Sequence, residues 1–108
     1  MSNLWKRVTD WNDEFFPDWR SRKPIYYSNA LAGECGEVCN SVKHLEGGGT
    51  HIQPSSSSYR TQMLEECIDV YIYMVLLLES QGYTEEDFER AFSLKINEIT
   101  SRMKGGKQ

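Results

Sequence analysis

Apolar residues recur every three to four positions in four segments of this chain, and this spacing restricts the fold more than any other feature. The first segment covers about residues 3–16 and ends at Pro17, which lacks the amide that a helix needs to continue. The other three cover about residues 25–45, 59–81 and 85–104. No segment alternates apolar and polar residues as a strand does, so the sequence predicts an all-α fold, a four-helix bundle.

One stretch, residues 47–58, lacks helical spacing. It contains three glycines, a proline and four consecutive serines. Such a segment cannot bury enough surface to offset the entropy of ordering it, so we expect a loop. The 108 residues suffice for one ordinary domain, and we expect a single domain over residues 1–108.

The charge balance and hydropathy exclude several classes of protein. Twelve basic and sixteen acidic residues give a net charge of −4, without a basic cluster to attract nucleic acid. The longest apolar run, residues 68–78, is interrupted by Asp69 and is about half the length that spans a bilayer. No charged-then-apolar leader opens the sequence. We therefore expect a cytoplasmic protein with neither a nucleic-acid nor a membrane partner.

Three cysteines are an odd number, and all of them lie in predicted helices. This usage is typical of reduced cysteines that fill a helical core. A zinc site formed by Cys35, Cys39, Cys67 and His44 is the alternative, although the chain has no CxxC pair.

Two short acidic strings carry the strongest chemical signal. Glu34 and Glu37 are three residues apart in the second predicted helix, as are Glu66 and Asp69 in the third. Positions i and i+3 lie about 60° apart around a helix, so each pair points in one direction. Both pairs border an apolar stripe. Packing of the two stripes would bring four carboxylates to one side of the interface.

Four carboxylates at close range repel one another unless a cation neutralises them. A ligand set made of oxygen atoms alone favours a hard ion, so the sequence predicts a Mg²⁺ site, with Mn²⁺ as a possible substitute. The alternative is that each acidic string is merely a solvated helix face.

The third predicted helix is apolar on all sides over residues 70–78. A helix of this kind must be covered on every face. One chain of this size supplies little cover, so we expect a homo-oligomer, either a dimer or a tetramer. The alternative is that this helix lies at the centre of the bundle.

The acidic strings and their neighbours resemble the MazG-like members of the all-α nucleoside triphosphate pyrophosphohydrolases. The similar segments are residues 30–38 (ALAGECGEV), residues 65–70 (EECIDV) and residues 95–98 (KINE) with Arg102. The resemblance covers about residues 27–103. It implies the four-helix bundle of that superfamily and the hydrolysis of a nucleoside triphosphate to the monophosphate and pyrophosphate.

The resemblance also implies roles for single residues. All four carboxylates named above match the family's metal-binding acids. Four further residues match its substrate-binding positions: Tyr73, Lys95, Asn97 and Arg102. Hydrolysis of a polyphosphate requires neutralised charge, an in-line water and a base. We expect Glu37 to orient or deprotonate the water as the catalytic residue, and Lys95 and Arg102 to hold the leaving pyrophosphate.

Aromatic and arginine residues in and after the first predicted helix are candidates for stacking on a nucleobase. They are Trp11, Trp19, Arg20 and Arg22. Of the two tryptophans, Trp19 is the predicted substrate-binding residue, since Trp11 has the helical spacing of a core residue. The alternative function is a non-catalytic helical protein that binds a nucleotide or a partner helix and uses its acids only as surface charge. The sequence leaves the identity of the nucleotide open.

Overall fold

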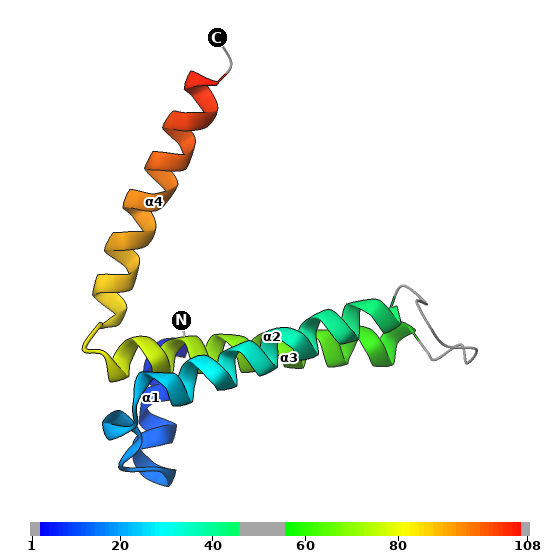
Figure 1. The fold of residues 1–108 in the computed structure, drawn as a ribbon, viewed down its shortest axis with the longest axis vertical. Helices are drawn as coiled ribbons and strands as arrows, with labels where there is room; N and C mark the ends of the chain where they lie inside the picture. The colour runs from blue at the N-terminus through cyan, green and yellow to red at the C-terminus, as the bar shows by residue number, and fades with distance from the viewer. Residues whose placement is uncertain (1–2, 46–55, 107–108) are drawn as a thin grey trace.

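The computed structural model describes residues 3–45 and 56–106, which form four α-helices and one short 3-10 helix (Figure 1). The helices are α1 (Leu4–Phe15), η1 (Trp19–Ser21), α2 (Pro24–Leu45), α3 (Ser56–Ser80) and α4 (Glu85–Gly105). No strand occurs in the described ranges, so the prediction of an all-α protein is confirmed.

The predicted helix limits agree with the structure to within a few residues. The largest difference is at α3, which begins at Ser56, so the last three residues of the predicted loop are helical. The rest of that predicted loop, residues 47–55, lies outside the described residues. Between α1 and α2 lies the short turn of η1, which the sequence did not predict.

Local interactions account for several helix ends. The Asn3 side chain caps α1 by accepting a hydrogen bond from the Lys6 amide over 2.9 Å. Thr84 and Asp87 form a reciprocal capping box at the start of α4. After α3 the chain turns at Gly82, whose φ of 89° is strained for residues with a side chain. The Tyr83 amide then donates to the Leu78 carbonyl, as in a helix C-terminal capping motif.

Helices α2 and α3 run antiparallel and side by side over most of their length (Figure 1). This pair carries the interface that the sequence predicted between the two acidic strings. Its inward positions include Tyr27 and Ser41 on α2, each only 1% exposed. Glu34 is seven residues from both, so it falls in the same line along the helix.

The hydrophobic core lies where α1 and η1 meet the C-terminal half of α3. Trp19, Tyr27 and Leu76 are its buried members, and Val8 and Ile72 pack against them. The Tyr27 hydroxyl donates a hydrogen bond to the Trp19 carbonyl, and the Trp19 indole N–H donates to Asp13 over 2.8 Å. Helix α3 therefore contacts α1, α2 and η1, which makes it the central helix of this part of the chain.

Helix α4 extends away from the other three helices (Figure 1). Near its start, the Phe88 ring lies 5.5 Å from the Trp5 ring, and the Trp5 indole N–H donates to Glu79 on α3. From Ala91 to Gly106 every residue is exposed. The radius of gyration is accordingly 17.7 Å, against about 13 Å for a compact domain of this length.

Across the described residues, no helix combines the length and the apolar character required to cross a membrane.

Candidate metal and substrate site

Three acids from two helices converge at the interface of α2 and α3. Glu34 of α2 and Glu66 and Asp69 of α3 each place a carboxylate oxygen within 4.8 Å of the others. All three side chains are partly buried. Within residues 3–45 and 56–106 no other group of histidine, cysteine or acidic side chains is arranged in this way.

The electrostatics of the three acids favour a cation. Burial raises the pKa of Glu34, and the neighbouring charges of Asp69, Glu66 and Glu37 raise it further. No arginine or lysine contributes to this shift. Each neighbouring carboxylate therefore makes the ionisation of Glu34 more costly, and a bound cation would remove that cost.

The donor set suits Mg²⁺ or Mn²⁺ in its chemistry. All the donors are carboxylate oxygens, which hard divalent cations prefer. Oxygen ligands of an octahedral Mg²⁺ lie at most about 4.2 Å from one another. The oxygens of Glu34, Glu66 and Asp69 lie within 4.8 Å of one another, a bound slightly wider than that separation.

The fourth predicted ligand, Glu37, is exposed and lies outside this group. The reason is its position on α2. Glu34 lies in line with buried Tyr27 and Ser41, and Glu37 is about 60° around the helix from that line, at the edge of the interface. Glu37 is still close enough to raise the pKa of Glu34. The structure thus groups three of the four predicted acids and leaves the fourth beside them.

Tyr73 lies next to the acids, one turn after Asp69 on α3. Burial raises the pKa of the Tyr73 hydroxyl, and the nearby groups Tyr26, Glu34 and Asp69 raise it further. Tyr73 thus stays a neutral hydroxyl at the edge of the carboxylate group, able to donate a hydrogen bond.

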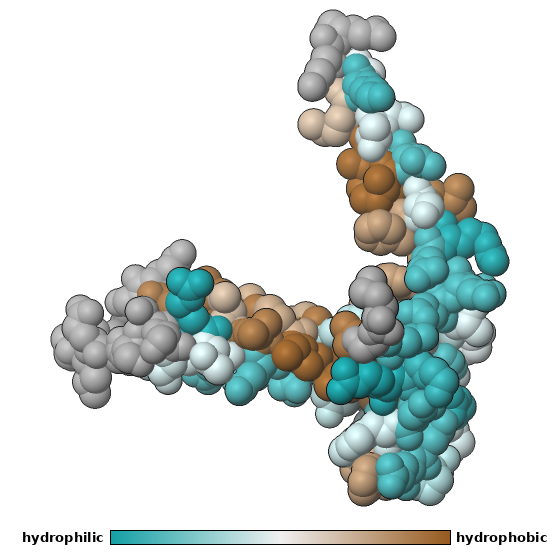
Figure 2. Space-filling model, turned by 180° about the vertical axis from the view of Figure 1, so that it is seen from behind, coloured by the Kyte–Doolittle hydropathy of each residue, from teal (hydrophilic) through white to brown (hydrophobic). Residues whose placement is uncertain are grey.

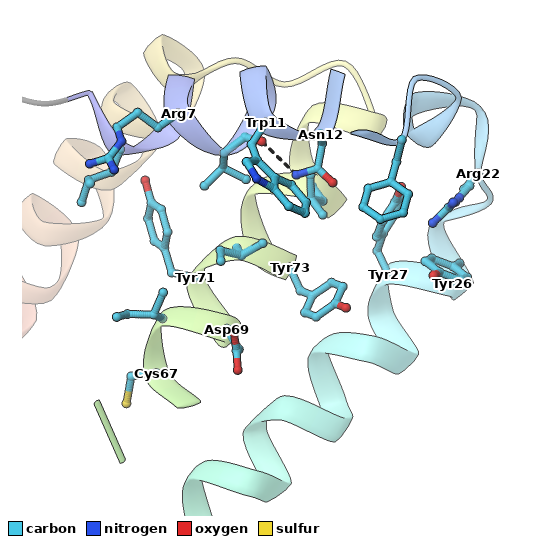
Figure 3. Close-up of a pocket in the computed structure, with 16 residues that line it drawn as sticks. Arg7, Trp11, Asn12, Arg22, Tyr26, Tyr27, Cys67, Asp69, Tyr71 and Tyr73 are labelled. Atoms are coloured by element: carbon cyan, nitrogen blue, oxygen red, sulfur yellow. Dashed lines mark hydrogen bonds between the residues drawn. The ribbon is translucent and has the colours of Figure 1, made fainter. Parts of the chain in front are cut away.

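A pocket of about 1030 Å³ adjoins the acids, between α1, α3 and the start of α2 (Figure 3). Asp69 and Tyr73 line the side nearest the acids, and most of the remaining lining is apolar or aromatic. The close-up shows the rings of Trp11, Tyr73 and Tyr26 around this space. An apolar pocket beside a few polar groups is the usual form of a small-molecule site.

Arg22 and Tyr26 both line this pocket. The sequence indicated Arg22 as a candidate for stacking on a nucleobase, but it did not indicate Tyr26. The Arg22 guanidinium stacks over the Tyr26 ring at 4.7 Å and lies 5.9 Å from the Phe16 ring. The sequence signal was an arginine four residues before a tyrosine at the start of a helix. The sequence alone did not reveal that this pair would line one pocket together with Asp69 of α3.

The two tryptophans occupy positions opposite to those expected. Trp19 is 1% exposed and belongs to the core, where Arg20 covers its ring at 4.2 Å. Trp11 is 53% exposed, contacts Phe15 and Phe16, and lines the pocket. In this structure Trp11, not Trp19, has an indole that a ligand in the pocket can reach.

The predicted phosphate contacts lie on α4, which the structure does not bring to the acids (Figure 1). Lys95 and Arg102 instead approach Glu98 of the same helix, at 4.0 and 3.5 Å. Asn97 is about 160° around the helix from Lys95 and about 140° from Arg102, so the three residues do not share a face.

The structure does not assemble the alternative zinc site. Cys35, Cys39 and Cys67 are exposed free thiols, so the expectation that they fill the helical core is wrong. The His44 ring stacks on Tyr59 of α3, with 5.3 Å between the ring centres.

Searches of protein-family models, of curated proteins and of solved structures found no match to this chain. The residues and their geometry are therefore the basis for assigning a function.

Proposed function

We propose that this protein is a Mg²⁺-dependent nucleoside triphosphate pyrophosphohydrolase, which converts its substrate to the monophosphate and pyrophosphate. One observation carries the proposal: three carboxylates from two helices converge within 4.8 Å beside an aromatic-lined pocket of about 1030 Å³. The carboxylates suit a metal that binds phosphate, and the pocket suits a flat organic group. A nucleotide has both parts.

In this proposal Glu34, Glu66 and Asp69 hold the metal. A bound Mg²⁺ would supply positive charge that neutralises the polyphosphate and polarises the attacked phosphorus. Glu37 lies beside this group without belonging to it, so its carboxylate is available to orient a water molecule and accept its proton. The water attacks the α-phosphorus, and the bond to the bridging oxygen of the leaving pyrophosphate breaks.

The pocket is the proposed nucleoside site. Trp11, Tyr26 and Arg22 offer ring and guanidinium faces on which a nucleobase can stack. Tyr73 lies between this pocket and the acids, where its hydroxyl can donate to a phosphate or ribose oxygen. The proposal thus replaces Trp19 with Trp11 as the stacking tryptophan.

The proposed roles of Lys95 and Arg102 require more than one chain, and Asn97, on another face of α4, is left out of this contact. Within a single chain α4 leads these residues away from the acids. Their contact with the leaving pyrophosphate therefore belongs to an assembled homo-oligomer, in keeping with the dimer or tetramer that the sequence predicts. The sequence also predicts a cytoplasmic protein, and a cytoplasmic nucleotide pool would supply the substrate.

A panel of canonical and modified nucleoside triphosphates tests the proposal. The protein is incubated with each triphosphate and Mg²⁺ or Mn²⁺, and monophosphate, pyrophosphate and orthophosphate are quantified separately. We expect equal amounts of monophosphate and pyrophosphate from at least one triphosphate, with no product in excess EDTA. Release of orthophosphate alone, or undiminished turnover in EDTA, would contradict the proposal.

The separation of Lys95 and Arg102 from the acids favours one second candidate, a helical protein that binds a nucleotide without hydrolysing it. Calorimetric titration with the same triphosphates distinguishes the two. Saturable binding without product in any metal would support the binding protein.

A further inference from the structure

Arg22 is a partly buried cation without an acid beside it. Every other arginine or lysine of residues 3–45 and 56–106 is exposed. Figure 2 shows hydrophilic residues gathered over α1 and along α4, and the ion pairs of the described residues lie on or next to these two helices. Arg22 takes part in none of these ion pairs. Since a charge partly removed from water is usually compensated by an opposite charge, this position suits an anionic ligand.

Two aromatic rings hold the Arg22 guanidinium in place. Its central carbon lies 4.7 Å from the ring centre of Tyr26 and 5.9 Å from that of Phe16. Rings contact the face of a guanidinium, whereas its N–H groups lie in the plane and point outward from the edge. Stacking, on these rings or on a nucleobase, therefore leaves the edge able to donate hydrogen bonds. Two parallel N–H groups of that edge match two oxygens of a phosphate.

The guanidinium and the acids lie on opposite sides of Tyr73. Arg22, Tyr73 and Asp69 line the same pocket, and the close-up shows Tyr73 between the other two (Figure 3). The electrostatics agree with this arrangement. Burial raises the pKa of the Tyr73 hydroxyl, Glu34 and Asp69 raise it further, and the charge of Arg22 lowers it. The Tyr73 hydroxyl thus lies between a negative group and a positive one.

The pocket has one other basic lining residue, Arg7. Its side chain is exposed, and Figure 3 shows it near Tyr71, at the opposite end of the pocket from Arg22. Arg7 does not contribute to the pKa shift of Tyr73. Arg22 is therefore the positive charge that acts on the part of the pocket next to the acids.

We propose that Arg22 binds the phosphates that leave as pyrophosphate, through the paired N–H groups of its guanidinium edge and within the same chain as the acids. This inference rests on the proposed function and deepens it. The metal held by the three acids neutralises one end of the polyphosphate, and Arg22 neutralises the end beyond Tyr73. Lys95 and Arg102 do not reach these phosphates from their own chain, because α4 extends away from the acids.

Calorimetric titration with inorganic pyrophosphate in the presence of Mg²⁺ tests this inference. Pyrophosphate carries no base, so stacking does not contribute to its binding. Arg22→Met removes the charge and keeps an unbranched stem beside Tyr26 and Phe16. It should raise the dissociation constant of pyrophosphate about tenfold or more, because charge-assisted hydrogen bonds to the ligand are lost. Arg22→Lys keeps the charge without the paired N–H groups and should raise the constant about threefold.

Lys23→Met is the matched control. Lys23 is the next residue, is exposed and does not line the pocket. This variant loses the same charge, so it reports the general attraction between the chain and an anion. The dissociation constant should stay within about twofold of that of the unaltered chain, because solvent screens an exposed charge. Circular dichroism of all three variants should show native helix content.

The affinities for pyrophosphate decide the inference. Weakening by Arg22→Met, with less in Arg22→Lys and none in Lys23→Met, would support it. Failure of the unaltered chain to bind pyrophosphate in Mg²⁺, or equal weakening by Arg22→Met and Lys23→Met, would overturn it. If Arg22→Met lacks native helix content, Arg22→Lys decides, and an unchanged affinity in that variant would overturn the inference.

The same titration separates this inference from the proposed function. Hydrolysis of a triphosphate, together with unchanged pyrophosphate affinity and unchanged KM in Arg22→Met, would overturn the role of Arg22 alone. Absence of hydrolysis, together with pyrophosphate binding that Arg22→Met weakens, would overturn the proposed reaction and support an anion site at Arg22.

Discussion

Glu34 on α2 and Asp69 on α3 place carboxylate oxygens within 4.8 Å of each other across the helix interface. Two acids this close disfavour joint ionisation, and Asp69 is the first of the charged neighbours that raise the pKa of Glu34. Glu34 also lies in line with the buried residues Tyr27 and Ser41. An acid at such a position destabilises the fold unless a cation or a proton compensates it. The first two predictions follow from this relationship.

Mg²⁺ should raise the melting temperature, because an ion that binds only the folded chain stabilises it by mass action. A 100-fold excess of ion over its dissociation constant corresponds to about 2.7 kcal/mol. Glu34→Gln and Asp69→Asn should abolish most of this increase, and Glu37→Gln should retain it, since Glu37 lies outside the group. Differential scanning fluorimetry at pH 7 measures the effect. An equal loss in all three variants would place Glu37 among the ligands.

Without metal, stability should depend on pH through Glu34. The pKa of Glu34 is raised in the folded chain, so the folded chain binds a proton at Glu34 more tightly than the unfolded chain does. The stability that this proton adds is fully present below the pKa of Glu34 in the unfolded chain. It is lost as the pH rises through the pKa of Glu34 in the folded chain. Glu34→Gln should flatten this part of the pH profile. Thermal unfolding of both chains in EDTA, from pH 4 to 7, measures this effect. Identical pH profiles for Glu34→Gln and the unaltered chain would show that Glu34 is solvated like an ordinary surface acid.

Glu37→Gln should lower turnover roughly 10²-fold or more, because the amide cannot accept the proton of the attacking water. Its matched control is Glu65→Gln on α3, another exposed acid outside the group of three. Glu65→Gln should keep near-native turnover. Pyrophosphate release under saturating substrate and Mg²⁺ provides the measurement. Near-native turnover in Glu37→Gln, with native circular dichroism, would show that Glu37 is only a surface residue.

Trp19→Ala should destabilise the fold by about 3–5 kcal/mol, because it empties the centre of the core around Tyr27 and Leu76. Trp11→Ala should cost much less, since that ring is 53% exposed. In an active preparation Trp11→Ala should instead raise KM, because Trp11 lines the pocket. Urea unfolding and steady-state kinetics separate the two effects. A raised KM with native stability in Trp19→Ala would restore Trp19 as the substrate contact.

Local sequence spacing was sufficient to predict the helices and part of the site. The limits of α1, α2 and α4 follow from apolar periodicity and from local signals such as Pro17 and the cap at Thr84. The i, i+3 spacing of the acids also predicted that α2 and α3 would present carboxylates to each other, and Glu34, Glu66 and Asp69 do so. These features depend on residues within one or two helical turns, so they can be derived without knowing the fold.

The tertiary structure decided the features that depend on how the helices are placed. Glu34 and Glu37 are about 60° apart around α2 by their spacing alone, and helix packing decides that Glu34 lies in the interface and Glu37 at its edge. The turn of η1 carries Trp19 into the core and leaves Trp11 at the pocket. A tryptophan side chain suits either place, so the residue type alone did not distinguish them. The direction of α4 depends on the Gly82 turn and on the Trp5–Phe88 contact. These outcomes rest on contacts between residues far apart in the chain, which periodicity alone does not specify.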